Sequence, residues 1–171
     1  MVGNHPFGGI EALFMVLIMS KIRPDYRIMA NDLLSRLEEV KDKLILVDPF
    51  HTPDSPRKNI PAMKEALAWL QQGGFLGVFP AGEVAALDLK TGKVQEPQWS
   101  VHIAKLIQKT GASVVPIYFH GQNSLLFQMA GLIHPTLRTA LLIREFVHSR
   151  RRVLQYELGK VIPPEKIASF S

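Results

Sequence analysis

Short apolar runs alternate with longer helical stretches along this chain, and this alternation constrains the fold more than any other feature. Strands are predicted at residues 26–30, 44–47, 75–79, 113–119 and 153–161, and helices at residues 10–21, 31–40, 62–72, 98–110 and 124–133. The proline-containing residues 48–57 and the polar residues 81–97 predict loops. We therefore expect one α/β domain over residues 1–171, with a mixed, largely parallel β-sheet flanked by helices.

The ends of three predicted strands carry the residues that are most useful for chemistry. In open α/β sheets, ligands bind in the crevice outside the carboxyl ends of the strands. Loops at residues 4–9, 80–85 and 120–123 follow such ends. The first loop begins three residues after the start of the chain, so we expect that the N-terminal strand is truncated.

The first loop contains a histidine and an acid that can work as a pair. Imidazole titrates near neutral pH, so His5 can accept a proton from an alcohol or an amine. A carboxylate from Glu11 on the other ring nitrogen would fix the tautomer, and the Gly8-Gly9 bend can fold the two side chains together. In the alternative, Glu11 complements only the positive end of its helix and His5 only caps a turn.

The other two loops are weaker signals. Pro80 and Gly82 predict a rigid turn whose amides can face a ligand, and Glu83 can pair with a basic group or an amine. Pro116 predicts that its strand lies at an edge or a bulge of the sheet. An ordinary turn and local hydrogen bonds of His120 and Asn123 are the alternatives to a site here.

Charge and composition limit the possible partners. The net charge is +5, divided as −1 over residues 1–85 and +6 over residues 86–171. The basic half indicates nucleic acid, an acidic membrane surface, or simply a basic soluble domain. The chain has no cysteine, which excludes thiol nucleophiles, and its six histidines show no metal-binding spacing. The longest apolar run, at residues 12–19, is well short of the roughly 20 residues of a membrane span.

Three blocks together carry a family resemblance. NHPFGGIE at residues 4–11, VFPAGEVA at 78–85 and SVVPIYFHG at 113–121 resemble, in this order, the conserved blocks of the glycerolipid or lysophospholipid acyltransferase superfamily, typified by 1-acylglycerol-3-phosphate acyltransferase. The run GLIHPTLRTALL at residues 131–142 is similar to a subgroup of hemolysin-annotated and ornithine-lipid-synthase-associated proteins.

The resemblance implies an O-acyltransferase of lipid metabolism that binds no cofactor. His5 would be the general base for a lyso-lipid hydroxyl, Glu11 would orient it, and acyl-CoA or acyl carrier protein would supply the acyl thioester. The implied substrate-binding residues are Asn4, Gly8, Gly9, Phe79, Pro80, Ala81, Gly82, Glu83, Arg138 and Arg144. The resemblance also implies that the protein is held peripherally at the cytoplasmic face of a membrane. It implies no bound metal and no nucleic-acid partner.

Several positions depart from the family pattern. Five residues separate the histidine from the acid instead of four, and Ala81 and Val84 replace a glutamate and a phosphate-binding arginine. A second arginine of the family is absent from residues 48–50. Either Arg138 and Arg144 replace the lost charge, or the acceptor lacks a phosphomonoester, as a lyso-aminolipid does.

Two other functions remain open at this stage. The departures favour a catalytically degenerate module that binds lipid or membrane, and the apolar stretch at residues 124–133 can contact a membrane or an acyl chain instead of the core. Residues 150–152 are all arginine and would meet anionic head groups. RNA binding is the third possibility, although no aromatic residues are interleaved with these arginines.

Overall fold

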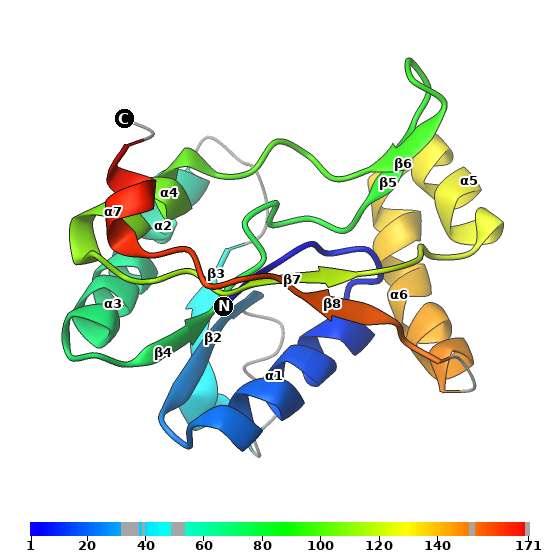
Figure 1. Cartoon of the computed structure of the whole chain (residues 1–171). Helices are drawn as coiled ribbons and strands as arrows, with labels where there is room; N and C mark the ends of the chain where they lie inside the picture. The colour runs from blue at the N-terminus through cyan, green and yellow to red at the C-terminus, as the bar shows by residue number, and fades with distance from the viewer. Residues whose placement is uncertain (32–37, 39, 49–53, 151–152, 170–171) are drawn as a thin grey trace.

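The computed structural model describes residues 1–31, 38, 40–48, 54–150 and 153–169. Its strands are β1 (Val2–Gly3), β2 (Tyr26–Asn31), β3 (Leu44–Val47), β4 (Phe75–Gly77), β5 (Ala86–Asp88), β6 (Lys93–Gln95), β7 (Pro116–Phe119) and β8 (Tyr156–Leu158). Its helices are α1 (Ile10–Ile22), η2 (Lys41–Lys43), α2 (Ser55–Lys58), α3 (Ile60–Gln71), α4 (Val101–Thr110), α5 (Leu125–Ile133), α6 (Pro135–Ser149) and α7 (Pro164–Ala168). The expected α/β fold is confirmed (Figure 1).

The strands form a mixed, largely parallel array. β3, β2 and β4 pair in parallel, as do β1 and β7, whereas β8 runs antiparallel to β7. A parallel bridge between Val2 and Val78 joins the two groups, so β1 lies between β4 and β7. The carboxyl ends of β1, β4 and β7 therefore lie at one edge of the array, where the three predicted loops begin.

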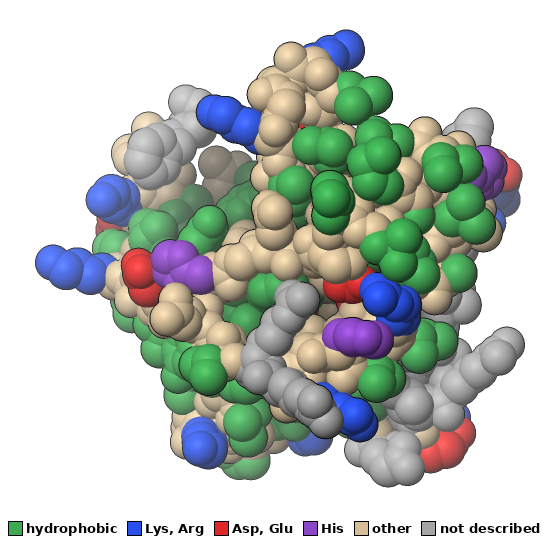
Figure 2. Space-filling model, turned by 90° about the vertical axis from the view of Figure 1, so that its right-hand side faces the viewer, with side chains coloured by type: hydrophobic (Ala, Val, Ile, Leu, Met, Phe, Trp, Pro, Cys, Tyr) green, Lys and Arg blue, Asp and Glu red, His purple; other side chains and the backbone are tan. Residues whose placement is uncertain are grey.

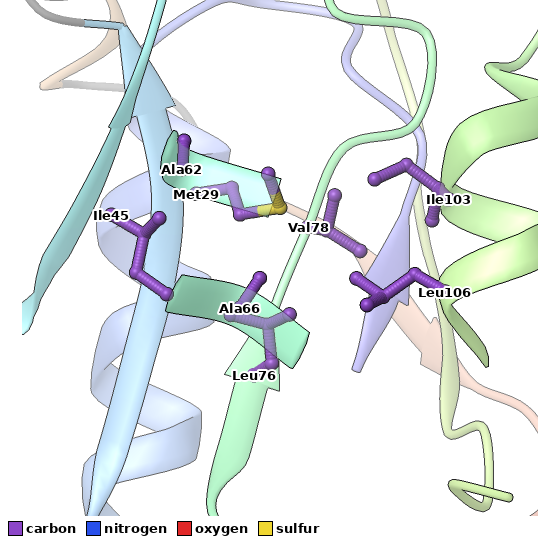
Figure 3. Close-up of a cluster of buried hydrophobic side chains, with 8 residues drawn as sticks. All are labelled: Met29, Ile45, Ala62, Ala66, Leu76, Val78, Ile103 and Leu106. Atoms are coloured by element: carbon purple, nitrogen blue, oxygen red, sulfur yellow. The ribbon is translucent and has the colours of Figure 1, made fainter. Parts of the chain in front are cut away.

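Helices cover both faces of the array, and each face has its own core. Neighbouring side chains along β2 show the division, because Ile28 packs with α1 and Met29 packs with α3 and α4. Figure 3 shows the second of these cores, which comprises Met29, Ile45, Ala62, Ala66, Leu76, Val78, Ile103 and Leu106. The two-sided burial explains why the strands are apolar runs and do not alternate with polar residues.

Two glycines let α1 approach the sheet closely. A Cβ on Gly77 of β4 would lie 2.7 Å from the sulfur of Met19, and one on Gly3 of β1 would lie 2.8 Å from the terminal methyl of Met15. Both methionine side chains are fully buried. This close packing fixes α1 against the sheet. Glu11, in the first turn of α1, is therefore held near the end of β1.

The structure corrects several local predictions. The presumed loop at residues 81–97 contains the β5–β6 hairpin, and part of the loop at 48–57 is α2. α6 and α7 were not predicted, and the last strand is three residues long instead of nine. β7 lies between β1 and β8 and not at an edge of the sheet. A proline is tolerated in this central strand because Pro116 is its first residue, where no N–H is needed for the ladder.

Other predictions lie outside the described residues. The expected helix at residues 31–40 falls largely there, as do two of the three arginines at 150–152. Within the described part of the chain, no helix combines the length and the apolar character needed to cross a membrane.

Candidate active site

The loop after β1 is tied to the loops after β4 and β7. The amide of Asn4 donates to the Phe119 carbonyl at 2.9 Å and accepts from the Phe119 N–H at 2.7 Å. The buried Asn123 donates to the carbonyl of Phe7 at 3.0 Å. On the other side, the N–H of Ala85 donates to the carbonyl of His5 at 3.0 Å. The three blocks that are distant in sequence are therefore one structural unit.

His5 and Glu11 form a close pair at the centre of this unit. Nδ1 of His5 lies 3.0 Å from Oε1 of Glu11. The Glu11 side chain is fully buried, and the His5 side chain is 15% exposed. Nδ1 is buried, and among the described residues it makes no hydrogen bond of ordinary geometry, so the contact with Glu11 is a close approach of the nitrogen to a carboxylate oxygen. A carboxylate at this distance can orient an imidazole.

Backbone amides of the loop hold the Glu11 carboxylate in place. Oε1 accepts from the N–H groups of Phe7 at 2.8 Å and Gly8 at 2.7 Å, and Oε2 accepts from the N–H of Gly9 at 3.2 Å. Gly8 has a φ of 93°, a left-handed conformation that glycine adopts without steric cost. The bend at Gly8 and the reach of a glutamate thus accommodate the extra residue between the histidine and the acid.

The surroundings keep Glu11 ionised. Burial alone would raise the pKa of this carboxyl group. The close approach of His5, together with the N–H groups of Gly8 and Phe7, outweighs burial and holds the pKa of Glu11 below its usual value of 4.5. Glu11 is thus a buried anion beside Nδ1 of His5.

Two further side chains support His5. The Phe79 ring stacks on the imidazole with ring centroids 4.5 Å apart and an interplanar angle of 25°. The backbone N–H of His5 donates to Glu96, whose other carboxylate oxygen accepts from Trp99 Nε1 at 2.9 Å. Sequence reasoning missed Glu96, because it lies in the polar segment between the second and third blocks and belongs to no motif.

The second block, residues 78–85, contributes a turn and an acidic side chain that pairs with an arginine. Pro80 and Ala81 are buried, whereas Gly82 is exposed at a φ of 69°. Oε2 of Glu83 lies 3.1 Å from a terminal guanidinium nitrogen of Arg138, and these side chains are 35% and 18% exposed. Of the two arginines that sequence reasoning selected, Arg138 therefore reaches this turn.

α6, which carries Arg138, packs directly on the loop between His5 and Glu11 (Figure 1). A Cβ on Gly8 would lie 2.7 Å from both Leu142 and Val84, and a Cβ on Gly9 would lie 3.4 Å from Phe146. Val84, which stands where the family has an arginine, is thus part of the packing under the loop. Pro135 at the first turn of α6 is the one sequence signal that predicts this helix.

The remaining candidates lie elsewhere. Arg144 contacts its neighbour Glu145 at 3.1 Å. His120 pairs with Glu157 at 2.9 Å, and both side chains are exposed. A small cavity of about 160 Å³ lies beside Phe7 and His120, whereas a larger one of about 260 Å³ lies between α4 and α7, away from His5 and Glu11.

Comparison with known proteins gives one informative similarity. The chain is 26% identical over 169 residues to a protein of Phocaeicola vulgatus named lyso-glycine lipid O-acyltransferase, and the match covers 95% of this chain. The chain spans 58% of the length of that relative. No protein-family model matches the sequence. The similarity supports an acyltransferase family and an enzyme of that kind.

Proposed function

We propose that this protein transfers a fatty acyl group from a thioester of coenzyme A or acyl carrier protein to a hydroxyl of a lyso-lipid acceptor. The observation that carries the proposal is the buried carboxylate of Glu11, held 3.0 Å from Nδ1 of His5 at the carboxyl edge of the sheet. General-base catalysis needs an imidazole in one tautomer and one orientation, and a carboxylate this close to Nδ1 supports both.

The reaction follows from the dyad without a covalent enzyme intermediate. Nε2 of His5 accepts the proton of the acceptor hydroxyl as its oxygen attacks the thioester carbonyl carbon. A C–O bond forms, the C–S bond breaks, and the departing thiolate takes the proton from the imidazolium. Glu11 stabilises the imidazolium while it exists, because its negative charge lies against Nδ1.

Arg138 is the residue that we assign to the acceptor head group. Its guanidinium is partly exposed and is held by Glu83 at the turn after β4. A guanidinium binds a carboxylate or a phosphate through paired hydrogen bonds. A lyso-lipid built on an amino acid through its nitrogen carries such a carboxylate, and the name of the relative, lyso-glycine lipid O-acyltransferase, points to this class of acceptor. We place the reaction at the cytoplasmic face of the membrane, where acyl thioesters are available.

The test is acyl transfer from labelled acyl-CoA and acyl carrier protein to a panel of lyso-lipids, including a lyso-glycine lipid and lysophosphatidic acid. We expect turnover with the amino-acid lipid and its loss in His5→Ala. His102→Ala, which alters an exposed histidine of α4, is the matched control and retains turnover. Equal turnover in the wild type and His5→Ala would overturn the proposal. Binding of acceptor by the wild type without transfer from either donor would select the degenerate lipid-binding module.

A further inference from the structure

α5 exposes an apolar face to solvent. Its inward side chains, Phe127, Gln128 and Ala130, are buried. Leu125 and Ile133 are 73% and 77% exposed. The apolar face of α5 consists of the exposed side chains Leu125, Leu126, Met129, Leu132 and Ile133. Figure 2, which views the molecule from the side of α5 and α6, shows hydrophobic side chains gathered in its upper half.

The β5–β6 hairpin extends this face and adds positive charge. The N–H of Leu87 donates to Gln128 of α5 at 2.9 Å, so the hairpin and the helix are fixed to each other. At the hairpin tip, Leu89 is 73% exposed, and the exposed Lys90 and Lys93 flank it. An apolar patch bordered by lysines is the combination that the interface of an anionic bilayer stabilises.

The acids of the same elements offset only part of this charge. Asp88 is half-exposed and opposes one of the two lysines, although it also accepts from the N–H of Lys90 at 2.8 Å, the hydroxyl of Thr91 at 3.1 Å and the amide of Gln95 at 2.8 Å. Glu145, the acid of α6, is buried. The charge presented by the hairpin, α5 and α6 is therefore positive.

We propose that the apolar face of α5 and the tip of the β5–β6 hairpin dock on a bilayer that contains anionic lipid. The proposal deepens the proposed function, because α6 connects this face to the dyad loop: it pairs closely with α5 and also packs on Gly8 and Gly9. Docking by this face would hold the edge with His5 and Arg138 near the lipid that supplies the acceptor. Vesicle binding is measured without turnover, so failure of docking and failure of acyl transfer are distinguishable.

The first test is sedimentation of the full chain with phosphatidylcholine vesicles, with and without phosphatidylglycerol. We expect binding that requires phosphatidylglycerol and weakens with added salt. The double variant Leu125→Ser/Ile133→Ser should bind about tenfold more weakly, since two exposed apolar side chains no longer enter the interface. Val101→Ser/Val161→Ser is the matched control, because these residues are 58% and 59% exposed and lie outside α5 and the hairpin.

The second test separates charge from apolar contact. Lys90→Gln/Lys93→Gln should reduce binding to the anionic vesicles and flatten its salt dependence. Lys105→Gln/Lys109→Gln on α4 removes the same charge from two exposed positions and should leave binding unchanged.

A third measurement does not depend on a change in affinity. The chain has no cysteine, so Leu125→Cys accepts a single environment-sensitive fluorophore, with Val101→Cys as the control. Emission from position 125 should shift to the blue with anionic vesicles, and emission from position 101 should not. The proposal is overturned if the wild type does not bind, if the two positions respond alike, or if the Leu125→Ser/Ile133→Ser variant changes a dimer into a monomer and leaves vesicle binding intact.

Discussion

Glu11 contacts His5 across five intervening residues, one more than in the acyltransferase pattern that the sequence resembles, and its carboxylate is fully buried. The three loop amides that bind this carboxylate take the place of the solvent that it has lost. The acid is thus fixed in place, with Nδ1 of His5 3.0 Å from it.

Changing Glu11 to Gln should reduce kcat about 10²- to 10⁴-fold, the range for general-base catalysis. The amide is nearly the same size but carries no charge to stabilise the imidazolium. Steady-state kinetics with a saturating acceptor measure the effect, and Glu65→Gln, which alters a half-exposed glutamate of α3, is the control. A kcat equal to that of the wild type would remove Glu11 from the mechanism.

The stability contributed by the Glu11 carboxylate should disappear in acid. Its pKa is lower in the folded state than the ordinary value of 4.5, so the folded protein favours the ionised form. This contribution is fully present above pH 4.5 and is lost as the pH falls through the folded pKa. Urea unfolding of the wild type and Glu11→Gln at several pH values tests this. The gap in unfolding free energy should narrow as the pH falls, and a gap that widens would contradict the assigned direction.

Arg138→Gln should raise KM for an anionic acceptor about ten- to a hundredfold, since hydrogen bonds to charged groups contribute about 1.5–3 kcal/mol. The effect on KM for the acyl thioester should be small. Arg144→Gln is the matched control, because Arg144 lies on the same helix but contacts Glu145 instead of the turn after β4. Equal changes in the two variants would show that Arg138 does not recognise the head group.

Gly8→Ala should lower the free energy of unfolding by about 1–3 kcal/mol more than Gly73→Ala. Both glycines have positive φ, at 93° and 81°, so both variants strain the backbone. The added methyl at position 8 also meets Leu142 and Val84, whereas nothing lies within 4 Å at position 73. Urea denaturation measures the free energy of unfolding of both variants. Equal losses of this free energy would mean that α6 shifts to make room for the added methyl group.

Sequence patterns correctly predicted the strands that are buried on both faces and the helices whose ends carry glycine or a capping residue. The predicted helix at residues 98–110 ends as expected at Gly111, which has a φ of 61°. Ser124 caps α5 by accepting from the N–H of Phe127. The contacts between the three strand-end loops were predictable because parallel strands end at a common edge.

The missed elements lack a periodic apolar signal. The inward side of α6 carries Arg138, Glu145 and Ser149 at positions where a core-facing helix usually has apolar residues. β6 is exposed at Lys93 and Gln95, so it has no buried face to reveal it. The place of a polar residue that contacts a distant part of the chain is known only from the three-dimensional structure, because its spacing in the sequence gives no periodic pattern.

The double hydrogen bond of Asn4 has a consequence for what this position tolerates. Its side chain substitutes for a peptide group, continuing the pairing of β1 with β7 after the backbone has turned away toward α1. Among side chains of this length, a carboxamide alone both gives and receives a hydrogen bond at neutral pH, so aspartate and leucine would each leave Phe119 short of a partner. Pairing with Phe119 of β7 thus requires an asparagine at position 4. The same pairing fixes the backbone that places His5, the next residue.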